Sequence, residues 1–114
     1  IRNKELSKAK KILENIISMK HALPIRRFNK DRAHQKITGP GRYPIKAGSV
    51  FLGLLNSVEA NAGNKGLDVN NLVIDFAKAD RAERRWRAGR KGRVMAKNTH
   101  VKIIVAEKKT GDKK

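Results

Sequence analysis

The stretch RAERRWRAGRKGR, residues 81–93, decides the fold of this 114-residue chain. It holds six arginines, one lysine and one tryptophan around two glycines, and Glu83 is its only acid. Cations at this density repel one another unless a polyanion neutralises them, so the stretch cannot be buried in a core. Strand-like segments flank it, at residues 72–79 and 101–106. The stretch is therefore predicted to be the far end of a β-hairpin that is pushed into nucleic acid.

The charge of the whole chain also favours a polyanionic partner. The 28 Lys+Arg against 10 Asp+Glu give a formal net charge of +18. Residues 1–40 carry eleven basic and three acidic side chains, residues 41–80 carry four of each, and residues 81–114 carry thirteen and three. The neutral middle is predicted to form the core, and the basic flanks are predicted to contact the partner. The length suits one domain, residues 1–114.

Two amphipathic helices are predicted from the spacing of apolar residues. The first lies within residues 1–20, with an apolar face of Leu6, Ala9, Leu13, Ile16 and Ile17. Residues 45–65 form the core helix, which Pro44 precedes and which Gly66 is placed to end with a left-handed cap. Its expected apolar face consists of Ala47, Val50, Phe51, Leu54, Leu55, Val58 and Ala62.

The remaining segments are basic or strand-like. Residues 21–44 form a basic segment without periodicity, which is predicted to be moulded on RNA. Within it, GPGR at residues 39–42 lacks the lysine and hydroxyl of a nucleotide-binding loop, and it predicts a turn. Residues 70–106 form the extended hairpin, with its tip near residues 87–92 and with Leu72, Ile74 and Phe76 on the core side. Residues 107–114 are predicted to be a flexible tail.

An enzymatic function is disfavoured. His21, His34 and His100 are scattered, and none has metal-ligand spacing to another His, Asp or Glu, so neither a metal nor a cofactor is expected. An RNase that uses a histidine beside lysines is the enzymatic alternative. The chain has no cysteine, and its longest apolar run, residues 50–55, is too short to span a membrane.

The residues expected to bind nucleic acid are mostly arginines, because guanidinium groups bind phosphate bidentately and stack on bases. Trp86, Tyr43 and Phe28 lie among arginines, where each could stack on an unpaired base or pack locally. The predicted RNA-binding residues are Arg26, Arg27, Lys30, Arg32, Arg42, Tyr43, Lys46, Arg81, Arg84, Arg85, Trp86, Arg87, Arg90, Lys91, Arg93, Lys97 and His100.

Several segments together resemble the universal large-subunit ribosomal protein twenty-two family, in its archaeal/eukaryotic form. These segments are PIRRFNK at 24–30, GPGRYP at 39–44, NA at 61–62 with KGLD at 65–68, and RAGR at 87–90 followed by TH at 99–100. They span nearly the whole chain in the order of the family, which is more specific than any one of them.

The resemblance implies a constituent of the large ribosomal subunit, in the cytoplasm, whose hairpin lines the exit tunnel for nascent polypeptide. Its partners would be large-subunit ribosomal RNA, neighbouring large-subunit proteins and the nascent chain. The tunnel-lining tip maps onto Arg87, Ala88, Gly89 and Arg90. Family members usually carry an N-terminal strand and helix before the segment that starts here, and one more residue between Ala88 and Gly89. The sheet is therefore expected to lack one strand, and the hairpin to be shorter.

The predicted fold is α+β: two main helices packed on a small antiparallel sheet with a long, extended basic β-hairpin, and with the N-terminal family strand absent. The alternative is a non-ribosomal RNA- or DNA-binding protein with a basic β-arm. A DNA-compacting protein of that kind would need a dimer interface, but the apolar face within residues 1–20 is required for intramolecular packing. The chain is therefore not expected to form a homo-oligomer.

Overall fold

The computed structural model describes residues 1–90 and 92–108 and confirms the predicted α+β class. Lys91 and the part of the expected tail at residues 109–114 lie outside the described residues. The helices and strands, in chain order, are α1 (Leu6–Ile17), β1 (Leu23–Pro24), β2 (His34–Gln35), β3 (Gly39–Arg42), α2 (Ile45–Asn64), the 3-10 turn η1 (Val69–Asn71), β4 (Leu72–Arg87) and β5 (Val94–Glu107).

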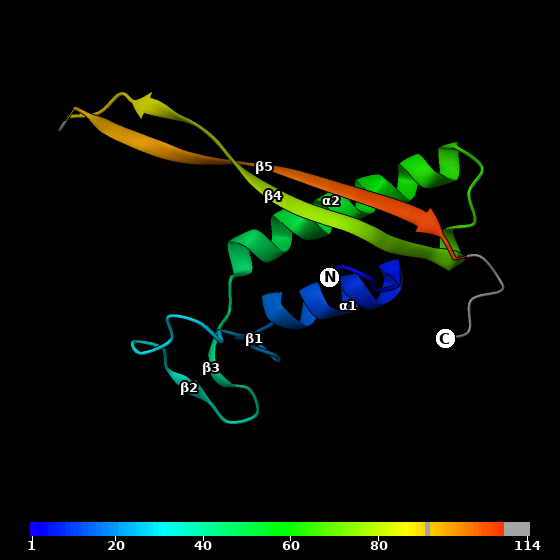
Figure 1. Ribbon diagram of the computed structural model, residues 1–114, viewed down its shortest axis with the longest axis horizontal. Helices are drawn as coiled ribbons and strands as arrows, with labels where there is room; N and C mark the ends of the chain where they lie inside the picture. The colour runs from blue at the N-terminus through cyan, green and yellow to red at the C-terminus, as the bar shows by residue number, and fades with distance from the viewer. Residues whose placement is uncertain (91, 109–114) are drawn as a thin grey trace.

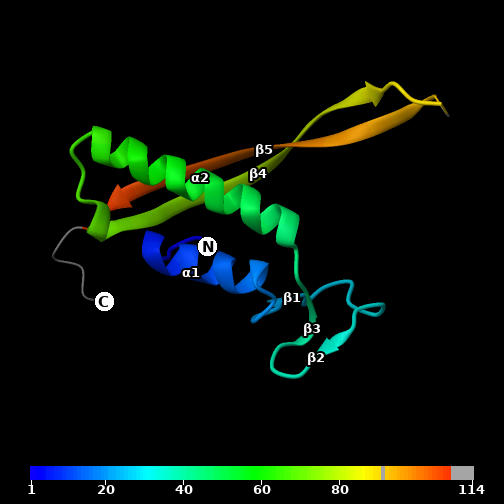
Figure 2. The ribbon, with the colours of Figure 1, turned by 180° about the vertical axis from the view of Figure 1, so that it is seen from behind.

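The hairpin of β4 and β5 sets the long dimension of the molecule. The two strands pair antiparallel from Leu72 with Glu107 to Arg87 with Val94, and the longest extent of the chain is 56 Å. Both helices lie against the inner half of the hairpin, whereas its outer half projects beyond them (Figures 1 and 2). The start of the chain follows the free edge of β4, where Glu5 forms an isolated bridge with Val73.

The hydrophobic core lies where the two helices meet the inner half of the hairpin. Its buried residues come from α1, α2 and β4, and they are Leu6, Ala9, Leu13, Leu55, Ala62, Leu72 and Ile74. The predicted face of α1 is confirmed, because its buried residues recur at three- and four-residue spacing. Burial of this apolar surface is the main force that holds the inner hairpin to the helices.

The predicted face of α2 is confirmed at Leu55 and Ala62, but it differs at Gly48, which is buried, and at Val50, which is not. Gly48, Leu55 and Ala62 are the buried residues of α2, and a Cβ on Gly48 would lie 3.1 Å from Ile17 Cγ1. The absence of a side chain at Gly48 thus lets the helices approach closely. Val50, predicted to face the core, is 58% exposed because it lies on the other side of this seam.

The predicted end of α2 is confirmed at Gly66. This glycine has φ +74°, a left-handed conformation that side chains disfavour. The N–H of Leu67 donates to the carbonyl of Ala62 at 3.0 Å, as in a helix that ends in a left-handed glycine. The turn directs the chain back along α2 into β4 (Figure 1).

A β-bulge corrects the predicted position of Phe76. The register moves from Ile74 opposite Val105 to Phe76 opposite Ile104, so Asp75 is an extra residue in β4. The bulge shifts the alternation, and Ala77 takes the core-facing position that was predicted for Phe76. The Phe76 ring instead packs under the side chain of Arg2, whose guanidinium carbon lies 5.5 Å from the centroid of the ring.

The basic segment at residues 21–44 has more regular structure than its sequence predicts. Its three short strands form a small antiparallel sheet in the order β1-β3-β2. Residues 39–42, predicted to be a turn, form the central strand β3. Gly41 makes this possible, because a Cβ at that position would lie 2.9 Å from the Cβ of Ala22. We call residues 21–44 the basic lobe.

Truncation of a buried side chain in α2 should destabilise the protein, whereas truncation near the hairpin tip should not. Leu55 is 0% exposed, so Leu55→Ala is expected to lower the free energy of unfolding by about 2–5 kcal/mol. Arg90 is exposed, so Arg90→Ala should change it by less than about 0.5 kcal/mol. Urea unfolding of both variants measures the difference, and equal destabilisation would mean that the tip belongs to the core.

Candidate nucleic-acid interface

Among residues 1–90 and 92–108, the hydrophobic core includes no residue from the outer half of the hairpin. We call residues 80–90 and 92–100 the outer arm. Every residue of the outer arm is exposed except Ala82 and Ala96, which are half-buried. All the predicted RNA-binding residues of this region that the structure describes are exposed, namely Arg81, Arg84, Arg85, Trp86, Arg87, Arg90, Arg93, Lys97 and His100.

The cations of the outer arm have no ion-pair partner among the residues that the structure describes. Within the described residues the ion pairs join Lys8 to Glu5, Lys10 to Glu59 and Lys78 to Asp80. None of these pairs includes an arginine, and the carboxylate of Glu83 is in none of them. A strand ribbon with this many free guanidinium groups is a surface for a polyanion.

A second β-bulge gathers three of these cations. Between the pairs Ala82–Asn98 and Arg85–Ala96, β4 has two residues where β5 has one. A hollow at this bulge is lined by Arg81, Ala82, Arg84, Lys97, Asn98 and Thr99. The side-chain amide of Asn98 donates to the carbonyl of Glu83 at 3.1 Å and holds the two strands together there. Three cations, a hydroxyl and an amide around one hollow suit a phosphate group.

Beyond this bulge, one face of the outer arm is apolar and the other carries arginines. Trp86 pairs with Met95 across the strands, and the tryptophan is 66% exposed. Arg85 and Arg87, which alternate with Trp86 along β4, point to the opposite face. Ala88 and Gly89 follow in the exposed turn, where the Gly92 N–H donates to the Gly89 carbonyl at 3.0 Å.

The basic lobe forms a second cationic surface. Arg26, Arg27, Lys30 and Arg42 are exposed there, and Lys46 is exposed in the first turn of α2. Arg32 and Tyr43 are half-buried, and the Tyr43 hydroxyl donates to Gln35 Oε1 at 3.3 Å. The basic lobe and the outer arm extend from the same side of the helical body but point apart (Figures 1 and 2). The predicted RNA-binding residues therefore form two surfaces rather than one.

Sequence reasoning missed two features of these surfaces. The hollow between Arg81, Arg84 and Lys97 depends on a bulge, which no residue in the stretch indicates. The sequence places Phe28 among arginines but does not indicate that its side chain is 94% exposed.

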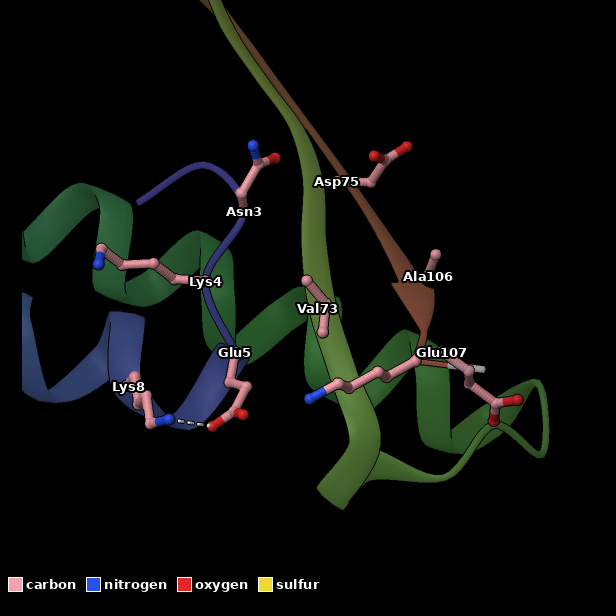
Figure 3. A pocket seen from close by; sticks show the side chains of 9 residues that line it. Asn3, Lys4, Glu5, Lys8, Val73, Asp75, Ala106 and Glu107 are labelled. Atoms are coloured by element: carbon pink, nitrogen blue, oxygen red, sulfur yellow. Dashed lines mark ion pairs between the residues drawn. The ribbon is translucent and has the colours of Figure 1, made fainter. Parts of the chain in front are cut away.

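A hollow of 640 Å³ lies at the base of the hairpin, between the start of the chain and the strand ends (Figure 3). Its lining is of mixed charge, with Lys4, Lys8 and Lys108 against Glu5, Asp75 and Glu107. Lys8 lies 3.0 Å from Glu5, and its hydrogen bond and charge lower the pKa of the Glu5 carboxyl. Balanced charge and an internal ion pair make this hollow a poor site for a polyanion.

Among residues 1–90 and 92–108, no group of three His, Cys, Asp or Glu side chains is placed to hold a metal ion. No helix in this part of the chain is long and apolar enough to cross a membrane. Of the surfaces considered in the described part of the chain, the two cationic ones are the best suited to a polyanion.

Comparison with known proteins identifies one family over nearly the whole chain. The family model described as ribosomal protein L22p/L17e matches residues 1–106. Similar proteins include the large ribosomal subunit protein uL22 of Staphylothermus marinus, 42% identical over 94% of this chain and 75% of that protein. The uL22 proteins of Thermoplasma volcanium and Zea mays are 40% and 35% identical, over 87% and 100% of this chain. The chain spans 60% and 73% of their respective lengths.

Proposed function

The chain belongs to the ribosomal protein L22p/L17e family, and we propose that it binds large-subunit ribosomal RNA through the outer arm and the basic lobe. Membership of this family makes it a structural constituent of the large ribosomal subunit, in the cytoplasm, rather than an enzyme. Neighbouring large-subunit proteins are further proposed partners, and the chain is proposed to act as a single copy.

One observation carries the proposal of RNA binding: the arginines of the outer arm have no carboxylate partner among the described residues, and no core lies behind them. The paired state of such a ribbon is only marginally stable in water, because an isolated two-stranded hairpin gains little free energy and its like charges repel one another. RNA phosphates supply the missing counter-charges. Arginine in place of lysine suits this ligand, because its planar fork binds phosphate through two parallel hydrogen bonds.

The two surfaces have different roles in this proposal. The basic lobe lies next to the start of α2 (Figure 1), and together with the exposed Lys46 of α2 it anchors the folded domain on RNA. The outer arm reaches away from the body and inserts between RNA segments that the body does not touch. The hollow at the second bulge receives a phosphate between Arg81, Arg84 and Lys97.

We further propose that the tip of the hairpin lines the exit tunnel and meets the nascent polypeptide, as the family resemblance implies. The tip residues are Arg87, Ala88, Gly89 and Arg90, all of which are exposed. The arginines bind RNA at the wall, while Ala88 and Gly89 keep the side-chain bulk at the lumen small. Apart from Gly89 itself and its chain neighbours, no described residue has an atom within 4 Å of a Cβ position on Gly89, which agrees with an open surface there.

Removal of the cations around the second bulge should weaken RNA binding and make it less dependent on salt. Affinity for a large-subunit ribosomal RNA transcript, measured by filter binding across a salt series, compares the triple variant Arg81→Ala, Arg84→Ala, Lys97→Ala with the unsubstituted chain. Each phosphate contact contributes about 0.7–0.9 to the slope of log affinity against log salt. The triple variant should therefore lose roughly 2–3 from the slope.

The matched control removes three exposed lysines that lie outside both surfaces, in Lys11→Ala, Lys20→Ala, Lys65→Ala. It lowers the net charge equally, so a slope change of less than about 1 is expected if contacts rather than total charge matter. Equal loss in the two triple variants would contradict the proposed interface. A preference for duplex DNA over the transcript would favour the alternative of a DNA-binding protein with a basic arm.

Deletion of residues 87–92 tests the tunnel proposal. Assembly of large subunits should remain largely intact, because the basic lobe keeps its own RNA contacts. Stalling of particular nascent chains should change, which translation of stalling sequences on the variant ribosomes measures. In unsubstituted ribosomes, photoreactive nascent chains should crosslink to this segment at the chain lengths that reach it. Crosslinks confined to other tunnel proteins at every chain length would reject the tunnel role and leave RNA binding intact.

A further inference from the structure

The loop between β1 and β2 is held at both ends by the central strand β3. On one side the N–H of Ile25 donates to the carbonyl of Pro40 at 2.9 Å, and on the other the N–H of Gly41 donates to the carbonyl of Ala33 at 3.3 Å. Because β1 and β2 lie on opposite sides of β3, the loop crosses from one edge of β3 to the other. Its position on the protein is therefore fixed, although its middle is exposed.

Phe28 lies in the middle of this loop, with an exposed side chain and a left-handed backbone conformation. Its side chain is 94% exposed, more than any other large apolar residue on the described surface. Its backbone has φ +52°, a conformation that is a genuine outlier for a bulky residue. Neither feature stabilises the free protein, because the ring gains no burial and the backbone is strained. Strain of this kind is concentrated at ligand-binding sites, where the surrounding structure maintains it.

The groups around Phe28 suit single-stranded RNA. Arg26 and Arg27 precede Phe28 in the chain and Lys30 follows it; all three are exposed and can bind phosphates. A hollow of 340 Å³ beside the ring is lined by Phe28, Asn29, Lys30 and Asp31. The side-chain amide of Asn29 and the carboxylate of Asp31 can form hydrogen bonds with the edge of a base. An aromatic ring between cations is the arrangement on which unpaired bases stack.

We propose that Phe28 is a stacking platform for one unpaired base of large-subunit ribosomal RNA, and that Arg26, Arg27 and Lys30 bind the neighbouring phosphates. The proposal rests on the proposed function, because it takes ribosomal RNA as the ligand. A protein partner is disfavoured by the charge of the basic lobe, in which six cations accompany a single acid, Asp31. Phe28 also differs from Trp86, which already has Met95 as a cross-strand neighbour.

Three substitutions in the full chain distinguish the effect of the aromatic ring from the effects of side-chain size and of the backbone conformation. Phe28→Tyr keeps a stacking ring, Phe28→Leu keeps an apolar side chain without one, and Phe28→Asn suits the left-handed backbone but removes the ring. Binding to the large-subunit ribosomal RNA transcript should stay within about twofold for Phe28→Tyr, and weaken by about 5- to 100-fold for Phe28→Leu and Phe28→Asn. The salt slope should not change, because no cation is removed.

Thermal unfolding of the same free variants tests a structural role for the ring. Stacking on RNA predicts that Phe28→Leu keeps the Tm of the unsubstituted chain, and that Phe28→Asn keeps or raises it because the backbone strain is relieved. Lower Tm values in both variants, in proportion to their loss of binding, would overturn the proposal. Equal affinity of Phe28→Leu and the unsubstituted chain would also overturn it, while failure of the unsubstituted chain to bind would reject the proposed function itself.

A photo-crosslink distinguishes a base from a protein as the group that meets residue 28. Ribosomes are assembled with p-benzoylphenylalanine in place of Phe28 and irradiated, and the adducts are mapped by mass spectrometry and reverse transcription. An adduct at a single nucleotide outside the helical regions of the RNA supports stacking. An adduct to a neighbouring ribosomal protein would overturn the proposal and assign this loop to a protein contact.

Discussion

Repulsion among cations that the protein leaves unpaired is the constraint on which the rest of this structure depends. From Asp80 outward, the described part of the chain provides neither a core behind the hairpin nor acidic partners for its arginines. The free energy that orders this ribbon must therefore come from elsewhere. A small core can hold only the inner half of β4 and β5, and a polyanion has to stabilise the outer half. The division of the chain into a helical body and an outer arm follows from this constraint.

Close packing of α1, α2 and the start of β4 lets a small helical body hold the base of a long hairpin. Gly48 lets α2 approach α1 closely, and Leu55 and Ala62 continue the same seam toward the hairpin base. Leu72 and Ile74 then attach β4 to both helices. Each bulge redirects the ribbon: the one at Asp75 lies at the edge of the core, and the one beside Arg84 lies within the cationic region. Bulges increase the local twist of a strand pair, so they also set the direction in which the tip points.

Much of this fold could be predicted from the sequence, because its helices and hairpin follow from local rules. The spacing of Leu6, Ala9 and Leu13 predicted α1, and Gly66 predicted the end of α2. The errors at Phe76 and Val50 have one physical cause, since a bulge or a helix crossing is decided by packing between elements. The strands of the basic lobe were missed because strands of two and four residues are too short to show alternation, and because the glycines and the proline of β3 are typical of turns. For the site, charge was predictable from composition, but the hollow at Arg84 and the exposed ring of Phe28 depend on tertiary geometry.

Amide hydrogen exchange along β4 and β5, with and without large-subunit ribosomal RNA, tests this account most directly. In the free protein, amides that pair the inner strands near Ile74 and Ala77 should exchange slowly, whereas those near Arg85 and Arg87 should exchange orders of magnitude faster. Binding of RNA should slow the outer amides and leave the inner ones nearly unchanged. Outer amides that are as protected in the free protein as the inner ones would contradict the claim that RNA orders the outer arm.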